Sequence, residues 1–255
     1  SYQTPSRFIP IAKAFFYFAC MIFRHSLGVC LQNAYLCKDK NNRHYIEDMT
    51  LAELQQYNFG FYFEDENGQR IYKDATDLEG QGLQIATADK LFEEFYEEYP
   101  DLLFIVEIKN EGELGYKACK LLSDTLNQYP NYKDQIVIGT FHDEIEQELK
   151  DKYPELMRGA PTGTAAKFIL TTFLGVNLFD QSDFGCLQIP TSYDLGITLT
   201  LDKKMIINRA HRRNVSVQYW TINDPDEMRR LIELGCDCIM TDNPVLLKSV
   251  LDEYR

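Results

Sequence analysis

Six short apolar segments, each followed by an amphipathic segment, occupy the chain from residue 102 to its end. The apolar runs lack the alternation of a half-exposed strand, as expected for parallel strands that are buried on both faces. Repeated strand–helix units predict a parallel sheet covered by helices. The predicted strands are 102–109, 135–141, 156–160, 186–190, 215–222 and 238–242.

Two folds, the doubly wound sheet and the (β/α)8 TIM-type barrel, fit this alternation. No GxGxxG or GxxxxGKS/T motif follows any of the strands, so a nucleotide-binding doubly wound sheet loses its support. The chain has 255 residues, and one barrel routinely has about 250. We therefore expect a single barrel domain over residues 1–255.

The segment before residue 100 predicts fewer regular elements. Residues 50–57 are expected to form a helix, because Thr50 and Glu53 have the spacing of a capping box. Residues 59–82 are rich in Gly, Asp and aromatic residues and predict a loop-like insertion. A second helix is expected over 87–100, where apolar residues recur at helical spacing.

The charge balance argues against a nucleic-acid partner. The chain has 26 Lys and Arg against 39 Asp and Glu, a net charge of −13. A nucleic-acid-binding protein needs a basic footprint that neutralises phosphates, and the one basic run, residues 209–213, is expected on a solvated helix end. A small anionic substrate stays compatible with an acidic protein if a bound metal supplies positive charge.

The cysteines predict the compartment. Seven cysteines form no CxxC pair, which indicates small core residues and a reducing compartment, so we expect a cytoplasmic protein.

Two apolar stretches could be taken for membrane spans. The apolar stretch 7–25 contains Pro10 and Lys13, and residues 165–179 are short and contain several polar residues. A spanning helix needs about 20 apolar residues. We expect a buried helix and strand over 7–25, with a membrane or export segment as the alternative, and a helix over 165–179.

Charged residues end the first strand of the repeat. Glu107 and Lys109 lie two residues apart and therefore on one face of the strand. Barrel chemistry sits at the C-terminal ends of strands, where a carboxylate suits Mg²⁺ or Ca²⁺ and a lysine suits an anionic group such as phosphate. A structural ion pair explains the two charges equally well. Other polar or aromatic residues at strand ends are Thr140, Phe141, Arg158, Gln188, Trp220, Thr221, Asn223, Thr241 and Asp242.

At two strand ends, a structural role is an alternative to a functional one. Trp220, the one tryptophan, fits either a core position or a pocket wall. Asp224 and Pro225 have the pattern of a helix N-cap followed by the first helical residue. The stretch Asp242-Asn243-Pro244 repeats this pattern, so Asp242 is expected to be structural.

Four stretches resemble the glycerophosphodiester phosphodiesterase family, over roughly residues 32–255: IEDMTLAELQQYNFGF (46–61), VEIKN (106–110), IVIGTFHDE (136–144) and VQYWTINDPDEMRRLIELGCDCIMTDNPVLL (217–247). The resemblance implies a (β/α)8 barrel that splits glycerophosphodiesters into sn-glycerol 3-phosphate and an alcohol. It also implies Glu107 as a ligand of Mg²⁺ or Ca²⁺, Lys109 as a phosphate contact and Trp220 as a pocket wall.

Residues 1–31 depart from the family pattern. The family opens with a strand ending in His-Arg-Gly, follows it with Glu-x-Asp, and then has a His-Asp pair. The register places Gln32-Asn33 at the His-Asp pair and Tyr17 and Ala19 at Glu-x-Asp, with His-Arg-Gly before residue 1. The resemblance thus leaves Glu107 as the one remaining metal ligand, and an amide such as that of Gln32 cannot perform acid–base catalysis.

Three interpretations stay open. The chain is a pseudoenzyme that binds a glycerophospho ligand through Lys109 and Trp220, an enzyme with a truncated or misread N-terminus, or a divergent enzyme that uses other groups such as His25 or His44. All three predict missing or irregular N-terminal strands. The first two also predict a weakly bound divalent cation and slow or absent hydrolysis of glycerophosphodiesters.

Overall fold

The computed structural model describes residues 16–24, 27–30, 35–39, 42–45, 48–65, 67–96, 103–176, 183–194 and 196–254, and before residue 48 it describes the backbone alone. The chain divides into two compact units. We call the one that contains residues 101–106 and 131–255 the C-terminal unit, and the one that contains residues 19–100 and 107–130 the N-terminal unit. Each unit is described by itself.

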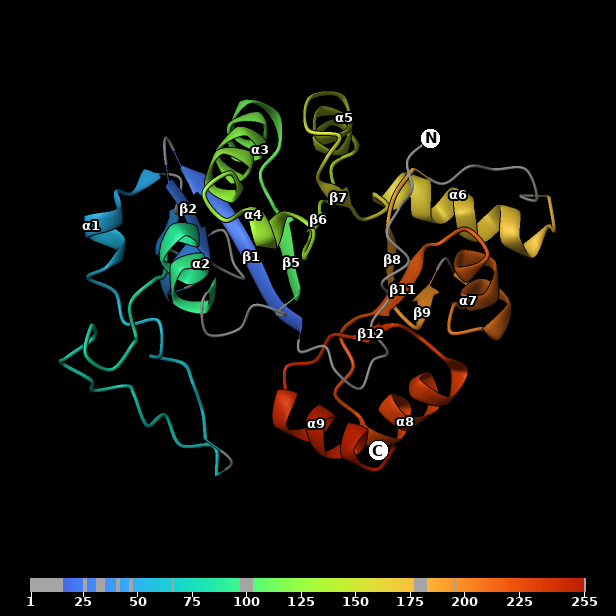
Figure 1. The fold of residues 1–255 in the computed structure, drawn as a ribbon. Helices are drawn as coiled ribbons and strands as arrows, with labels where there is room; N and C mark the ends of the chain where they lie inside the picture. The colour runs from blue at the N-terminus through green and yellow to red at the C-terminus, as the bar shows by residue number, and fades with distance from the viewer. Residues whose placement is uncertain are drawn as a thin grey trace. The chain divides into compact units, whose positions relative to one another are not determined.

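The C-terminal unit is built on six strands, which are β5 (Leu103–Ile108), β6 (Ile136–Gly139), β7 (Met157–Arg158), β8 (Cys186–Ile189), β11 (Ser216–Tyr219) and β12 (Cys238–Ile239). The last two residues of β5 belong to the N-terminal unit. β5, β6 and β7 are neighbours in one sheet, and β8, β11 and β12 form another. A parallel bridge between Gly159 and Cys186 connects β7 with β8. Spatial order therefore follows chain order (Figure 1), which confirms the predicted succession of six strands.

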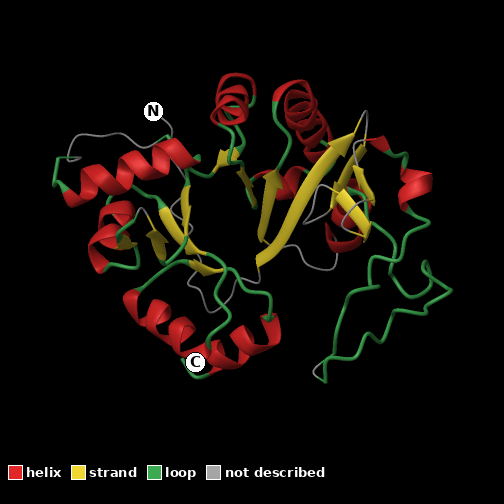
Figure 2. Ribbon diagram, turned by 180° about the vertical axis from the view of Figure 1, so that it is seen from behind, coloured by secondary structure: helices red, strands yellow, loops and turns green. Residues whose placement is uncertain are grey.

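Helices follow the later five of these strands as the sequence predicts. They are α5 (Asp143–Lys152), α6 (Thr162–Phe173), α7 (Lys204–His211), α8 (Pro225–Leu234) and α9 (Pro244–Asp252). A further short helix before β6, α4 (Pro130–Lys133), was not predicted. In Figure 2 the helices of this unit lie outside its strands. One hairpin was not predicted: β9 (Ser192–Asp194) pairs antiparallel with β10 (Thr198–Thr200) in the connection from β8 to α7.

Apolar side chains hold α6, α7 and α8 against β8 and β11. The shared core contains Leu187, Ile189 and Val217 from the strands, and these residues are at most 3% exposed. Burying such a side chain stabilises the fold by about 1.5–3 kcal/mol. The helices contribute Phe168, Ile169, Ile206, Ile207, Ala210, Met228 and Leu231.

The other side of β8 and β11 carries polar side chains. Gln188 Nε2 donates to Gln218 Oε1 over 2.9 Å, and Gln218 Nε2 donates to Ser216 Oγ over 3.3 Å. Two glycines make room for Gln188, since a Cβ on Gly139 would lie 2.9 Å from its Oε1 and a Cβ on Gly159 3.0 Å from it. A chain of hydrogen-bonded amides and a hydroxyl thus satisfies the polar atoms of this layer.

The helix predicted over residues 165–179 has different ends. α6 begins at Thr162, after Pro161 in the N-cap position, and stops at Phe173. It stops there because Gly175 has a φ of +69°, a left-handed conformation that ends helices. Residues 177–179 lie outside the described residues. Within the described chain no helix is both long and apolar enough to cross a membrane.

The N-terminal unit begins with antiparallel pairs. Most of β1 (Phe16–Arg24) belongs to it and pairs with β2 (Leu27–Cys30), and β3 (Tyr35–Asp39) pairs with β4 (Asn42–Tyr45). These hairpins interrupt the strand–helix alternation, as expected for irregular N-terminal strands. Of the stretch predicted as a buried helix and strand, residues 16–24 are strand, and residues 7–15 and His25 lie outside the described residues.

Three helices complete this unit, α1 (Leu51–Leu54), α2 (Ala88–Tyr96) and α3 (Gly112–Leu126). The predicted capping box is confirmed: Thr50 Oγ1 accepts from Glu53 N, and a Glu53 carboxylate oxygen accepts from Thr50 N. α1 is nevertheless a single turn, because the chain leaves the helix at Gln55.

The predicted insertion at residues 59–82 has neither helix nor strand among its described residues (Figure 2). Asn58 ties its base together, because its Nδ2 donates to Tyr72 O over 2.7 Å. At its tip Asp65 Oδ1 accepts from the backbone N–H groups of Asn67 and Gln69. These hydrogen bonds lower the pKa of Asp65, and the one from the Gln69 N–H has the largest effect. Burial of the carboxylate opposes the shift.

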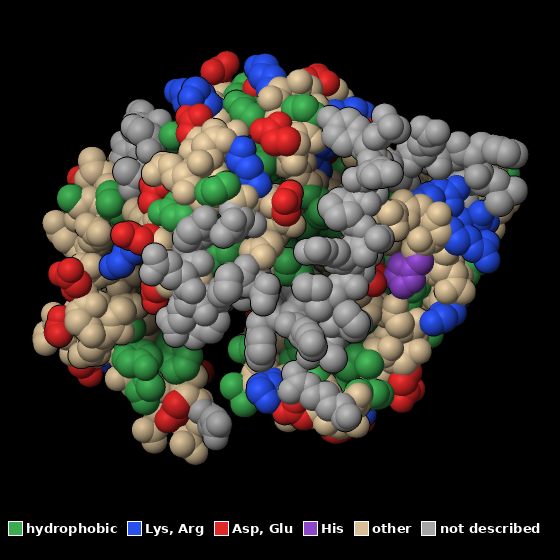
Figure 3. Space-filling model, in the orientation of Figure 1, with side chains coloured by type: hydrophobic (Ala, Val, Ile, Leu, Met, Phe, Trp, Pro, Cys, Tyr) green, Lys and Arg blue, Asp and Glu red, His purple; other side chains and the backbone are tan. Residues whose placement is uncertain are grey.

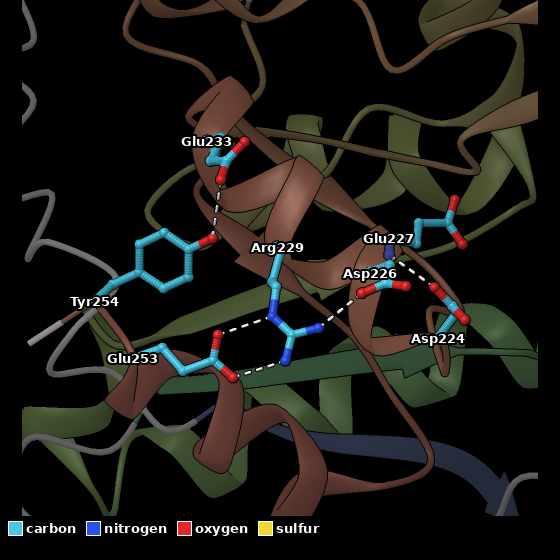
Figure 4. Close-up of polar contacts among 7 residues, drawn as sticks. All are labelled: Asp224, Asp226, Glu227, Arg229, Glu233, Glu253 and Tyr254. Carbon is cyan, nitrogen blue, oxygen red and sulfur yellow. Dashed lines mark hydrogen bonds and ion pairs between the residues drawn. The ribbon is translucent and has the colours of Figure 1, made fainter.

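A polar junction joins α8 to the end of α9 (Figure 4). Arg229 holds both carboxylate oxygens of Glu253, at 2.7 and 2.8 Å, and its Nη1 lies 2.8 Å from Asp226 Oδ1. Asp224 caps α8, as predicted, by accepting from Glu227 N over 2.8 Å. α9 is capped by Asn243 rather than by Asp242.

Replacing Asp224 with Ala should lower the free energy of unfolding by about 0.5–2 kcal/mol, because the first turn of α8 loses its cap. Urea denaturation measures the change. Asp226→Ala is the matched control: Asp226 lies on the same turn and makes an exposed ion pair, whose loss costs about 0–1 kcal/mol. Equal losses in the two variants would contradict the capping role of Asp224.

Glu253→Gln should reduce stability at pH 7 and make no difference in strong acid. The hydrogen bond from Arg229 holds the pKa of Glu253 below its usual value of 4.5. A lowered folded-state pKa means stability that is present above the unfolded pKa and is lost as the pH falls through the folded pKa. Urea midpoints at pH 7 and pH 3 measure this. Glu155→Gln, at an exposed glutamate without an ion pair among the described residues, should change neither midpoint.

Candidate functional site

The end of β5 brings together the two charges predicted to share a face. Lys109 Nζ lies 2.8 Å from Glu107 Oε1, and the Glu107 and Lys109 side chains are 11% and 26% exposed. Both residues belong to the N-terminal unit. Because water reaches this pair only in part, its attraction is stronger than that of an exposed pair, and removing one partner would leave a poorly solvated charge.

The residues around Glu107 offer few ligands to a divalent cation. Mg²⁺ prefers six oxygen ligands and Ca²⁺ six to eight. Among the described residues no group of three His, Cys, Asp or Glu side chains is placed to hold a metal ion. Glu107 is one carboxylate and already contacts an ammonium group. The described residues therefore do not make up a metal site by themselves.

The C-terminal unit places two aromatic residues at strand ends. Trp220 follows β11 and Phe141 follows β6, and their ring centroids lie 6.2 Å apart in an edge-to-face arrangement. β7 and β8 lie between β6 and β11 in the strand order, so neighbouring strands do not bring the two rings together. Phe141 is 58% exposed, and Trp220 is partly buried. An aromatic pair of which one ring is exposed and the other partly buried can form an apolar wall for a ligand.

Arg158 is turned away from these strand ends. Its Nε lies 3.2 Å from Glu146 Oε1 of α5, and its Nη2 donates to Asp183 O over 3.0 Å. Arg158 is buried, so these partners compensate for the lost hydration of its charge. Among the strand-end residues it therefore has a structural role in attaching α5.

The ends of β11 and β12 are linked by hydrogen bonds around Asn223. Its Oδ1 accepts from Asp242 N and from Thr241 Oγ1, each over 2.9 Å, and its Nδ2 donates to Asp242 Oδ2 over 2.9 Å. Thr241 in turn accepts from Asn243 N. Asn223 and Asp242 thus hold the two strand ends together. This supports the structural role expected for Asp242.

Buried thiols offer no nucleophile in the described core. Cys119, Cys186, Cys236 and Cys238 are buried free cysteines, as predicted. Burial raises the pKa of Cys236 to about 12, and it raises the pKa of Cys186 and Cys238 as well. A thiol with such a pKa is not ionised near neutral pH and is therefore inert.

The remaining family positions fall outside the side chains that the structure describes. Gln32, Asn33 and His25 are not among the described residues. Tyr17, Ala19 and His44 lie in strands of which the backbone alone is described. Their assignments stay predictions, as do the metal role of Glu107, the phosphate contact of Lys109 and the pocket role of Trp220. Because Lys109 and Trp220 belong to different units, their predicted convergence on one cavity also stays a prediction.

Comparison with known proteins identifies a family. Residues 25–246 match the model of the glycerophosphoryl diester phosphodiesterase family. A protein of Mycobacterium tuberculosis (strain ATCC 25618 / H37Rv) named "probable glycerophosphodiester phosphodiesterase 2" is 24% identical over 178 residues, which are 68% of this chain and 62% of that protein. A glycerophosphodiester phosphodiesterase of Arabidopsis thaliana is 30% identical over 61 residues, 24% of this chain and 19% of that protein. The matched region is thus less than two thirds of either relative.

A solved structure has the same fold. A phosphodiesterase of Oleispira antarctica, in complex with the product sn-glycerol-3-phosphate, superposes with a TM-score of 0.62. The match covers 92% of this chain and 84% of that one at 19% sequence identity. The strand and helix order of the C-terminal unit agrees with a TIM-type barrel, which is the fold predicted from the sequence.

A double-mutant cycle on Glu107→Gln and Lys109→Met should give a coupling free energy of about 1.5–3 kcal/mol, as for a hydrogen bond between charged, partly buried groups. Urea denaturation of the four proteins measures it. The control is the cycle on Lys120→Met and Asp124→Asn of α3, an exposed pair expected to give about 0.3–0.5 kcal/mol. Similar values in both cycles would show that the Glu107–Lys109 pair is an ordinary surface contact.

Proposed function

Because the chain belongs to the glycerophosphoryl diester phosphodiesterase family, we propose that it hydrolyses glycerophosphodiesters to sn-glycerol 3-phosphate and an alcohol. The observation that carries the proposal is the Glu107–Lys109 pair at the end of β5. It places a positive charge, held in position by a carboxylate, where parallel-barrel enzymes have their active sites. The product complex of the Oleispira relative supports this class of ligand.

Lys109 is proposed to contact the phosphate. An ammonium group is a compact positive charge that attracts phosphoryl oxygens. Glu107 fixes the direction of this charge through the 2.8 Å contact. The site would therefore bind a phosphodiester through a charge that is already oriented, which reduces the entropy lost on binding.

Trp220 is proposed to line the pocket together with Phe141. The edge-to-face contact fixes the ring of Trp220 against a partner that follows a different strand. Aromatic faces bury the carbon atoms of a ligand while its polar groups bind elsewhere. In a glycerophosphodiester these carbon atoms belong to the glycerol or to the alcohol.

The divalent cation is proposed to bind weakly. Bound next to the phosphate, it would neutralise charge on the phosphoryl oxygens. Glu107 would hold it in competition with the Lys109 ammonium group, and the described residues offer no group of three His, Cys, Asp or Glu side chains that could hold it.

Hydrolysis by this chain is proposed to be slow. The resemblance puts Gln32 where the family has a histidine, and an amide neither donates nor accepts a proton at neutral pH. The second candidate function follows from the same residue: a barrel that binds a glycerophospho ligand through Lys109 and Trp220 without turnover. The four described free thiols support a reducing, cytoplasmic setting for either function.

Turnover of glycerophosphocholine should be at least about a hundredfold lower in this chain than in a repaired version, because general acid–base catalysis contributes about 10²–10⁴-fold. The repaired version carries Gln32→His and Asn33→Asp, with residues 1–31 replaced by a family segment that has His-Arg-Gly and Glu-x-Asp. Release of sn-glycerol 3-phosphate is measured with excess Mg²⁺ or Ca²⁺ and with a chelator. Equal activity of the two would show that the register is wrong and would direct attention to His25 and His44.

Calorimetry with sn-glycerol 3-phosphate separates binding from turnover. We expect binding by the unchanged chain, and a loss of about tenfold or more in affinity for Lys109→Met, since one oriented charge contact is worth about 1.5–3 kcal/mol. Lys117→Met, at an exposed lysine of α3, is the control and should leave binding unchanged. Equal affinity of Lys109→Met and the unchanged chain would contradict the proposed phosphate contact of Lys109, on which both candidate functions depend.

A further inference from the structure

The helices α6 and α7 of this acidic protein contain no acidic residue. Residues 162–176, which contain α6, and residues 203–214, which contain α7, have no Asp or Glu. The same two stretches contain Lys167, Lys203, Lys204, Arg209, Arg212 and Arg213. Against a net charge of −13 for the chain, this segregation concentrates positive charge on one part of the C-terminal unit. Figure 3 shows Lys and Arg side chains gathered over α7.

The two helices present their basic sides to solvent. Phe168 and Ile169 of α6 and Ile206, Ile207 and Ala210 of α7 belong to one buried core cluster. The faces opposite to these residues therefore point outward on both helices. The guanidinium group of Arg213 lies 6.0 Å from the ring centroid of Phe168, which links the helices further. We call the two outward faces together the α6–α7 surface.

Four cations of the α6–α7 surface have no ion pair within the described chain. They are Lys167, Lys203, Arg209 and Arg212. Elsewhere in the same unit arginines are paired: Arg229 binds Glu253 and Asp226, and Arg230 binds Asp202 and Glu227. Unpaired cations on neighbouring turns repel one another, so an anion bound between them would relieve the repulsion.

A hollow lies along α7. It has a volume of about 380 Å³ and is lined by Lys204, Met205, Asn208, Arg209 and Arg212. Arginine side chains bind phosphate groups with two parallel hydrogen bonds, and an asparagine amide adds a further donor. The hollow therefore offers donors and positive charge to a phosphate group from one side.

Large apolar side chains border the basic residues. On α6 and the turn after it, Leu170 is 59% exposed, Leu174 65% and Val176 66%, and Met205 of α7 is 43% exposed. The buried residues of α6 face the core, so these three aliphatic groups project away from it. Apolar groups next to cations form the amphipathic pattern of proteins that lie on membrane interfaces.

We propose that the α6–α7 surface docks this protein onto membranes that contain anionic phospholipids. The phosphate groups of the lipids would bind at Arg209 and Arg212, and Leu170 and Leu174 would enter the interface. The acidic remainder of the protein would be repelled by the same membrane, which fixes the orientation of docking. In this arrangement the protein would bind to the membrane surface, and no helix would cross the bilayer.

Vesicle co-sedimentation tests the proposal with the whole chain. We expect binding to vesicles of phosphatidylcholine with phosphatidylglycerol, loss of that binding at high salt, and little binding to pure phosphatidylcholine. The variant Arg209→Glu with Arg212→Glu should bind at least about tenfold less, because each basic residue near an anionic surface contributes severalfold to affinity. Leu170→Ser with Leu174→Ser should weaken binding at both low and high salt.

The control variant is Lys117→Glu with Lys120→Glu on α3, which changes the net charge equally at exposed residues of the other unit. It should leave vesicle binding within about twofold, and circular dichroism should show all variants folded. Equal loss in the control, or no binding to the anionic vesicles, would overturn the proposal. Binding of inositol hexakisphosphate without vesicle binding would also overturn it and would identify a site for soluble anions instead. These outcomes are independent of hydrolysis, so failure here leaves the proposed function untouched.

Discussion

The parallel strands of the C-terminal unit are buried on both faces, and the rest of the unit follows from how each face is covered. On the outer face, apolar residues of β8 and β11 meet those of α6, α7 and α8, which is the larger share of the stabilisation. On the inner face, Gln188, Gln218 and Ser216 bond to one another. Gly139 and Gly159 leave the space in which Gln188 fits. On β8 and β11, apolar packing on one face is therefore matched by satisfied polar contacts on the other.

Much of this fold could be predicted from the sequence, because the strands are buried enough to appear as apolar runs. β5 was predicted to within one residue at each end. The N-cap of α8 was predicted from the sequence of Asp224 followed by Pro225. The hairpin of β9 and β10 escaped prediction because its three-residue strands are largely exposed and carry no apolar pattern. The end of α6 escaped because Gly175 stops the helix inside a run of apolar residues.

The candidate site was predictable only where its residues are close in sequence. Period-two alternation on one strand was enough to pair Glu107 with Lys109. The contact between Phe141 and Trp220 joins strands that are not neighbours, so no local pattern signals it. Gly139 at the end of β6 and Gly159 after β7 are a sequence signal for this polar layer, since a glycine in a strand often marks a close approach of another group.

The hydrogen-bonded layer of Gln188, Gln218 and Ser216 carries no proton that titrates between acid and alkaline pH. Acidification therefore leaves the charge of this layer unchanged, in contrast to a layer built from Asp, Glu or His. A pH profile of ligand binding would therefore report on groups outside this layer. The polar layer inside the C-terminal unit therefore keeps the same charge at every pH at which ligand binding would be measured.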